Sequence, residues 1–279
     1  MARTYVITGA GSGIGKTTAE LLREQGHTVV GVDLKGAEVD ADLSTVQGRA
    51  DAVAAAIAAA NGSVDAVIAC AGISAPSALT ASVNYFGMTE FLEGIRATLA
   101  ESDAPRAALI SSVSSVQPNF PPLVDALLSD DEEAALAVAE QITGDERTAN
   151  LVYPSSKRAI SRWVRREAPS EGWAGAGIPL NAVGPGIVTT PMTKDLIATP
   201  EGAAQVDAVV PMPLNYHQPP ESVARLLIWL TSEQNTHMCG QTLYCDGGAE
   251  VELRGGDVWS AYDEAVNAKF AEIAGGMQG

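Results

Sequence analysis

Short apolar segments rich in β-branched residues alternate with helical segments along most of this chain, and this alternation restricts the fold more than any other feature. The segments expected to form buried strands are residues 4–8, 28–33, 64–70, 107–112, 178–183 and 241–245. Helical spacing of apolar residues occupies residues 14–25, 45–60, 82–100, 154–168 and 220–231. Strands and helices that alternate in this way form βαβ units, so we predict an α/β fold with a doubly wound parallel sheet and helices on both faces.

The whole chain, residues 1–279, is predicted to form a single domain, because its length suits one α/β core and no linker divides it. Two segments look like additions: an insertion near residues 118–150, with prolines and an acidic helical stretch, and a C-terminal extension at residues 250–279. In the extension, Tyr262, Val266, Phe270 and Ile273 recur at helical spacing. Either segment could cover the surface, contact another subunit or form a wall of the active site.

Charge and composition exclude several classes of function. The net charge of −17 argues against nucleic-acid binding, which needs clustered lysine and arginine. The three cysteines are an odd number without C-x-x-C spacing and the three histidines are scattered, so we expect neither a disulfide framework nor a metal site. No apolar run approaches the ~20 residues of a membrane span, and the chain opens directly on a strand. We therefore expect a cytoplasmic protein without a membrane partner.

The segment VITGAGSGIGKTT, which begins within the first predicted strand, has two interpretations. Ala10 to Thr17 fits a loose P-loop, A-x-x-x-x-G-K-T, which would make the protein a nucleoside triphosphatase. Alternatively, Gly9, Gly13 and Gly15 form the turn of a dinucleotide-binding unit: Gly9 for the sharp turn, Gly13 for close approach to the pyrophosphate and Gly15 for helix packing. Asp33 favours the second interpretation, because it ends the second strand where a carboxylate meets the adenosine ribose.

Tyr153 and Lys157 have the spacing of two side chains on one helical face. A tyrosine hydroxyl has a pKa near ~10, too high for a base at neutral pH. An ammonium ~4 Å away contributes up to ~4 kcal/mol at an effective dielectric constant of ~20, so we expect Lys157 to lower the pKa of Tyr153. Such a phenol could exchange a proton with an alcohol or carbonyl during hydride transfer.

Two further polar residues are candidates for the same site. Ser112 ends the fourth predicted strand, at the sheet edge where ligands bind in doubly wound folds, and its hydroxyl could polarise the reacting oxygen. Asn84, in SVNYFG, could hold a water that connects Lys157 to solvent, or it could cap or bridge the backbone locally. The sequence leaves these two roles of Asn84 open.

These motifs together resemble the short-chain dehydrogenase/reductase family over residues 3–250. TGAGSGIG at residues 8–15, Asn84, Ser112 and Tyr153-x-x-x-Lys157 carry the resemblance, with NAVGPGIVTTPM at residues 181–192 and a late Asp-Gly-Gly. The resemblance implies a Rossmann-type sheet of about seven strands and serine–tyrosine–lysine catalysis with asparagine as proton-relay partner. A narrower resemblance, to the bacterial 3α-hydroxysteroid dehydrogenase/carbonyl reductase group, is carried by the long insertion and by AEVDADLST, SVNYFG and ISSVSS.

The expected cofactor is NAD, since Asp33 would repel the 2′-phosphate of NADP and Ser12 stands where NADP-preferring relatives often carry a basic residue. By resemblance, Asp42 and Leu43 flank the adenine and Thr189 bonds the nicotinamide carboxamide or a phosphate. The other expected cofactor contacts, also by resemblance, are Gly9, Ser12, Gly13, Ile14, Gly15, Ala71, Gly72, Tyr153, Lys157, Pro185, Gly186 and Ile187.

The expected substrate is a hydrophobic secondary alcohol or its ketone, such as a hydroxysteroid, a terpene alcohol or a cyclic alcohol. Residues 187–214 are apolar and are expected to form a mobile lid over the site. We also expect a homodimer or homotetramer. A non-catalytic NAD(H)-sensing protein on the same fold is the main alternative, and the P-loop nucleoside triphosphatase is the other.

Overall fold

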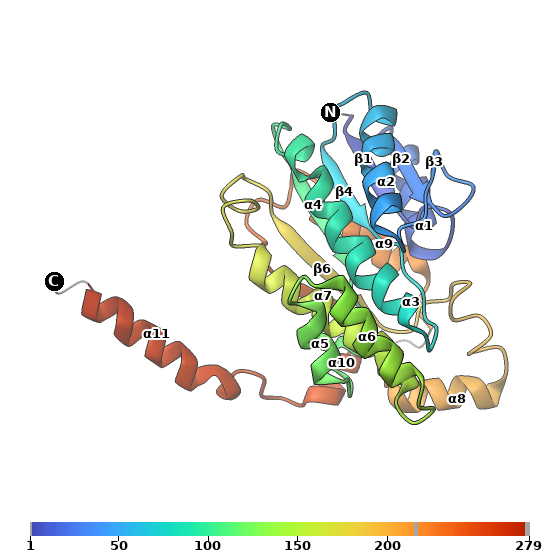
Figure 1. Ribbon diagram of the computed structural model, residues 1–279, viewed down its shortest axis with the longest axis vertical. Coiled ribbons are helices and arrows are strands. Elements are labelled where there is room, and N and C mark those ends of the chain that lie inside the picture. The colour runs from blue at the N-terminus through green and yellow to red at the C-terminus, as the bar shows by residue number, and fades with distance from the viewer. Residues whose placement is uncertain (1, 215–216, 277–279) are drawn as a thin grey trace.

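The computed structural model describes residues 2–214 and 217–276, and its strands form one parallel sheet (Figure 1). Within these residues the sheet has seven strands in the order β3-β2-β1-β4-β5-β6-β7, which confirms the predicted Rossmann-type topology. The strands are β1 (Thr4–Thr8), β2 (Thr28–Asp33), β3 (Val39–Asp40), β4 (Ala66–Ala69), β5 (Arg106–Ile110), β6 (Leu180–Pro185) and β7 (Thr242–Cys245). The two-residue edge strand β3 was missed, because it is too short to show a periodic pattern.

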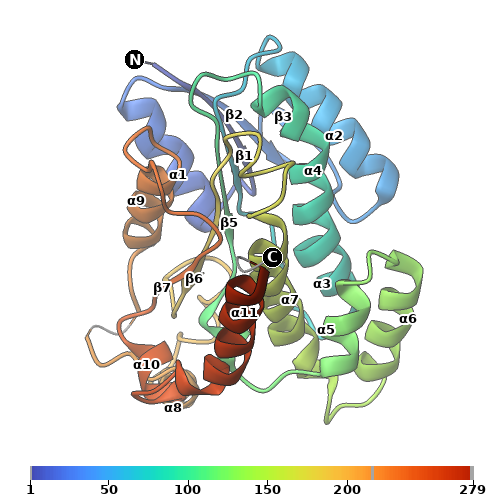
Figure 2. The same ribbon diagram turned by 90° about the vertical axis from the view of Figure 1, so that its left-hand side faces the viewer.

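Helices cover both faces of the sheet, as Figure 2 shows: α1 and α9 lie on one face, and α2, α4 and α7 on the other. The longer helices of these two layers are α1 (Gly13–Glu24), α2 (Val46–Ala59), α4 (Gly87–Leu99), α7 (Val152–Glu167) and α9 (Pro220–Leu230). The remaining described α-helices are α3 (Ala78–Ala81), α5 (Pro121–Leu127), α6 (Glu132–Thr143), α8 (Pro200–Val209), α10 (Ala249–Arg254) and α11 (Asp263–Gly276). Short 3₁₀ turns are η2 (Val113–Val116), η3 (Ala149–Leu151) and η4 (Ser260–Tyr262).

The helix expected at residues 82–100 is interrupted in the structure. It starts earlier, with α3, passes through a π-helical turn, η1 (Ser82–Phe86), and continues as α4. The wider turn places Asn84 on the inner side, where it is fully buried. Such a turn depends on what the helix packs against, so helical periodicity alone does not reveal it.

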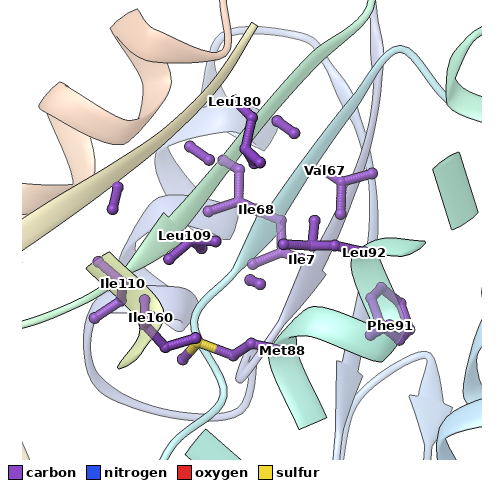
Figure 3. Close-up of a cluster of buried hydrophobic side chains, with 14 of the residues drawn as sticks. Ile7, Val67, Ile68, Met88, Phe91, Leu92, Leu109, Ile110, Ile160 and Leu180 are labelled. Carbon is purple, nitrogen blue, oxygen red and sulfur yellow. The ribbon is translucent and has the colours of Figure 1, made fainter. Parts of the chain in front are cut away.

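The core lies on both faces of the sheet, under α1 and α9 on one face and under α4 and α7 on the other. In Figure 3, Met88 of α4 and Ile160 of α7 point toward each other beside Ile110 at the end of β5. Strand residues such as Ile68 and Leu109 are completely buried, as expected for a parallel sheet covered on both faces. Each such side chain contributes roughly 1.5–3 kcal/mol by leaving water, and this packing fixes the carboxyl ends of the strands.

The two additional segments differ in how they meet this core. The insertion forms α5 and α6, which pack against α7 and α3 and bury Leu123, Leu127 and Ile142. The C-terminal extension forms α10 and then α11, which extends away from the rest of the molecule in Figure 1. Of the four residues expected on one face of that last helix, the side chain of Ile273 lies outside the described residues, and the other three are exposed.

Candidate active site

The turn between β1 and α1 is built on glycines that no larger residue could replace. Gly9 has a φ of +71°, and a Cβ on it would lie 2.7 Å from the Ala71 nitrogen. A Cβ on Gly15 would lie 2.2 Å from the Gly9 carbonyl oxygen. Ser12 is the N-cap residue of α1 but makes no side-chain cap bond, so it leaves the first-turn N–H groups of the helix to an outside acceptor. This cradle fits the pyrophosphate of a dinucleotide.

Asp33 stands beside this turn at the carboxyl end of β2. Its Oδ2 accepts a hydrogen bond from the Gly11 N–H (2.8 Å), and its Oδ1 accepts one from the Leu34 N–H (2.7 Å). Lys16, which the P-loop interpretation would need at the phosphates, instead lies on the exposed side of α1, with its ammonium 3.9 Å from the Glu20 carboxylate. The position of Lys16 therefore does not support the nucleoside triphosphatase interpretation.

A cavity of about 510 Å³ lies along the carboxyl ends of the strands and collects most of the residues expected at the site. Those that line it are Gly9, Ser12, Gly13, Ile14, Gly15, Asp33, Asp42, Leu43, Ala71, Gly72, Ser112, Tyr153, Lys157, Pro185 and Gly186. Asn84, Ile187 and Thr189 are not among the lining residues.

The positions of Ile187 and Thr189 follow from the extended backbone after β6. Ile187 packs in a small separate cluster with Val113, Val210 and Met212, and Thr189 Oγ1 donates to the His217 carbonyl. Successive side chains of an extended segment point to opposite sides, so Val188 and Thr190 line the cavity instead. The sequence does not fix this one-residue register, because positions 187 and 188 are both apolar and positions 189 and 190 are both threonine.

Tyr153, Ser112 and Lys157 meet at the end of β5. The Tyr153 and Ser112 side chains both line the cavity there, and the Ser112 hydroxyl is near enough to lower the pKa of the Tyr153 phenol. Lys157 lies one helical turn after Tyr153, with Nζ 5.8 Å from the centre of the Tyr153 ring. That ammonium donates to the Ile110 carbonyl oxygen (2.9 Å), so the last residue of β5 holds Lys157 at the cavity.

Burial governs the charges of this group. It raises the pKa of the Tyr153 phenol, and the nearby Ser112 hydroxyl only partly offsets this. Burial also lowers the pKa of Lys157 to about 8. Lys157 is not among the causes of the Tyr153 shift, so the expected lowering of the Tyr153 pKa by the ammonium is not seen in this structure. The protonated phenol is consequently the stable form at neutral pH.

Asn84 makes the hydrogen bonds of one of the two roles that the sequence left open, that of bridging the backbone locally. Its Oδ1 accepts from the Ile73 N–H (2.8 Å), and its Nδ2 donates to the Ile73 carbonyl (3.0 Å) and to Ser156 Oγ (3.2 Å). The side chain therefore bridges the backbone behind the cavity. A Cβ on Gly72 would lie 3.1 Å from Asn84 Oδ1 and 3.7 Å from Lys157 Nζ, so the amide and the ammonium border the same glycine.

The outer part of the cavity is apolar. Leu79 and Val83 line it from the α3–η1 side, and Val188, Pro191 and Met192 line it from the segment after β6.

Within residues 2–214 and 217–276 we find no group of histidine, cysteine and carboxylate side chains that could hold a metal ion. Across the same described part of the chain, no helix combines the length and the apolar character needed to traverse a bilayer.

Known proteins resemble this chain in both sequence and structure. Residues 133–250 match the family model described as enoyl-(acyl carrier protein) reductase. A 3-alpha-hydroxysteroid dehydrogenase/carbonyl reductase of Comamonas testosteroni is 34% identical over 254 residues, covering 89% of this chain and 97% of that protein. A cis-4-hydroxycyclohexanecarboxylate dehydrogenase of Sinomonas cyclohexanicum is 29% identical over 262 residues, covering 88% of this chain and 96% of that protein.

Among solved structures, the 3-alpha-hydroxysteroid dehydrogenase of Pseudomonas sp. B-0831 complexed with NADH superimposes with a TM-score of 0.81 at 36% identity. The superposition covers 90% of this chain and 98% of that one. The agreement therefore extends over most of both chains. The chain belongs to the short-chain dehydrogenase/reductase family and is an NAD(P)-dependent oxidoreductase.

Proposed function

We propose that this protein is an NAD-dependent oxidoreductase that interconverts a hydrophobic secondary alcohol and its ketone. The observation that carries the proposal is that Ser112, Tyr153 and Lys157 line the same cavity as the glycine turn and Asp33. Two neighbouring hydroxyls in a cavity that also holds a dinucleotide-binding turn suit a substrate that carries one reacting oxygen.

NAD fits the residues around Asp33 better than NADP does. Both carboxylate oxygens are oriented by backbone N–H groups, which leaves their remaining lone pairs for the two ribose hydroxyls, while the charge repels a 2′-phosphate. The glycine turn would bind the pyrophosphate, Asp42 and Leu43 would flank the adenine, and Ala71, Gly72, Pro185 and Gly186 would line the nicotinamide side. The similar Pseudomonas enzyme was solved with NADH, which supports this choice.

The proposed chemistry assigns the proton to this chain's side chains. When bound, the nicotinamide ring would accept or supply the hydride. In oxidation, Tyr153 would first lose its own proton to solvent, and its Oη would then take the hydroxyl proton of the alcohol. In reduction, the protonated phenol would give its proton to the carbonyl oxygen, and Ser112 Oγ would donate a hydrogen bond to that oxygen. Because burial raises the pKa of Tyr153, the phenol is ready to act as an acid at neutral pH. Alcohol oxidation should accordingly accelerate as the pH rises.

The proposed substrate class follows from the apolar outer wall. Leu79, Val83, Val188, Pro191 and Met192 offer surface for a hydrocarbon skeleton and no charged group to bind a phosphate or coenzyme A. The names of two similar enzymes specify a hydroxysteroid and a hydroxylated cyclohexane, both cyclic secondary alcohols. The proposed substrates are therefore a hydroxysteroid, a terpene alcohol or a cyclic alcohol.

The test combines a substrate panel with the Tyr153→Phe variant. Oxidation of steroid, terpenoid and cyclohexanol substrates would be followed through NADH absorbance, with NAD and NADP compared. We expect turnover with NAD and a loss of about 10³-fold or more in kcat for Tyr153→Phe, while its Kd for NADH stays within about twofold of the parent. Parent protein that binds NADH but oxidises no member of the panel would overturn the proposal in favour of the NAD(H)-sensing alternative.

A further inference from the structure

The cavity wall at residues 42–44 is held from behind by a buried arginine. Arg49, on α2, is 1% exposed, and its Nη1 donates to the carbonyl oxygen of Leu43 (3.3 Å). Its Nε donates to Oε2 of Glu90 on α4 (2.6 Å). An arginine in an Ala-rich helix is expected at the protein surface, yet Arg49 is among the largest fully buried side chains of the structure.

The insertion supplies the other partner of this arginine. Glu132, the first residue of α6, accepts a hydrogen bond from Arg49 Nη2 through Oε2. Its Oε1 lies 3.2 Å from the hydroxyl of Ser82, and the same hydroxyl donates to the carbonyl oxygen of Ser44 (2.7 Å). Two consecutive carbonyl groups of the wall, those of Leu43 and Ser44, are therefore bound by side chains that both contact Glu132.

The helices behind the wall leave it little room to move. A Cβ on Gly48 of α2 would lie 1.9 Å from the carbonyl oxygen of Asp42, and one on Gly87 of α4 would lie 3.2 Å from that of Leu43. Asp42, Leu43 and Ser44 line the cavity directly in front of these contacts. A shift of Arg49 or Ser82 would thus be passed on to the wall, because interiors this closely packed have discrete arrangements.

This arrangement suits positioning better than stabilisation. Replacing a buried ion pair by apolar side chains is often neutral for folding, whereas its fixed geometry restricts the groups that it holds. Glu132 itself is not among the residues that line the cavity, and it is connected to the wall through Arg49 and Ser82. The most direct consequence of the network is therefore a fixed shape of the wall.

We propose that Glu132 and Arg49 are positioning residues for the adenosine half of the cofactor, so that the insertion tunes affinity for NAD(H) without touching it. The inference rests on the proposed function, in which the wall at residues 42–44 flanks the adenine. It gives α6 a role beyond surface cover.

The test compares Glu132→Gln with Glu133→Gln. Both variants remove one charge from the first turn of α6, but Glu133 is exposed and serves as the matched control. For Glu132→Gln we expect the Kd for NADH and the KM for NAD to rise about fivefold, with kcat within about twofold of the parent. ADP-ribose, which keeps the adenosine but lacks the nicotinamide, should lose affinity by the same factor. Glu133→Gln should match the parent in all four measurements.

Other outcomes separate the two proposals. If the parent protein does not bind NADH, the proposed function fails. If the parent binds NADH and folded Glu132→Gln binds NADH and ADP-ribose equally well, only the positioning role fails. If Glu132→Gln does not fold, Ser82→Ala decides, since it removes the hydroxyl between Glu132 and Ser44: an increase of about twofold in the Kd for ADP-ribose supports the role, and an unchanged value overturns it.

Discussion

The insertion and the C-terminal extension are both additions to the seven-stranded unit, yet only the insertion is built into it. Leu123 and Leu127 of α5 are completely buried, whereas Trp259 and Phe270 in the extension are 71% and 67% exposed. Both segments carry apolar residues at helical spacing. Helical spacing of apolar residues therefore predicts a helix but not the surface against which the helix packs. The insertion is connected to the core at both ends, by β5 and α7, and the extension at only one.

The insertion also supports the helix that carries the candidate catalytic pair. The Phe120 N–H donates to Ser155 Oγ (2.9 Å), two residues from Tyr153 on the same helix. Further along α7, Arg162 pairs with Asp125 (2.9 Å). Because α7 presents Tyr153 and Lys157 to the cavity, contacts with α5 help to fix their positions. In the extension, α10 contacts η2, the turn that follows Ser112, whereas α11 contacts η4 of the extension itself.

The largest expected effect on this comparison comes from Leu127→Ala. The change removes a fully buried side chain between α5 and the core, and should lower the free energy of unfolding by about 3 kcal/mol through lost burial and the cavity left behind. Leu253→Ala in α10 is the matched control: Leu253 is partly exposed, so its loss should cost under ~1 kcal/mol. Urea unfolding of both variants measures this. Equal losses would contradict the distinction between the two segments.

The Lys157→Met variant tests how much stability the protein loses by burying the ammonium of Lys157 on α7, the helix that the insertion supports. The pKa of Lys157 falls from 10.5 to about 8 through burial, which corresponds to a penalty of about 3 kcal/mol for the charged form. Since the pKa is lower in the folded state, this penalty is complete below pH 8 and disappears as the pH rises toward 10.5. Loss of the bond to Ile110 returns about 1 kcal/mol, so the variant should be about 2 kcal/mol more stable than the parent at pH 7, and inactive.

The measurement for Lys157→Met is urea unfolding of variant and parent at pH 7 and at pH 10. The advantage of the variant should shrink at the higher pH, because the parent then folds with a neutral amine. An advantage that is the same at both pH values would mean that packing, and not the buried charge, causes it. If the variant is less stable than the parent at pH 7, the ammonium stabilises the folded state. Packing of the insertion against α7 is then not needed to offset the burial of that charge.

The sequence predicted the parts of this molecule that local patterns determine. Apolar β-rich runs located the longer strands, glycine chemistry located the turn after β1, and four-residue spacing placed Tyr153 and Lys157 on one face. Properties that depend on packing were not predictable. Arg49 is buried because Glu90 of α4 and Glu132 of α6, from distant parts of the chain, close over it, and the pKa of Tyr153 is raised by loss of hydration at the cavity. The register that turns Val188 and not Ile187 into the cavity is likewise set by contacts with the segment after α8.

The smallest expected effect comes from truncation after Gly256, which removes α11. Trp259, Tyr262, Val266 and Phe270 are all at least half exposed, so little apolar burial is lost with them. We expect the free energy of unfolding to change by less than ~0.5 kcal/mol, and kcat/KM by less than about twofold. Urea unfolding and steady-state kinetics of the truncated and full chains measure this.

Two outcomes of the truncation would break the comparison between insertion and extension, and they differ in kind. A tenfold loss of kcat/KM at unchanged stability would place the extension over the cavity in the working enzyme. A lower sedimentation coefficient than the lost mass accounts for would show that its apolar side chains join subunits, since buried apolar surface is what stable association requires. In either case the exposed apolar side chains of the extension would pack against a surface that is not in contact with them in the single chain. The extension, like the insertion, would then be part of a packed structure.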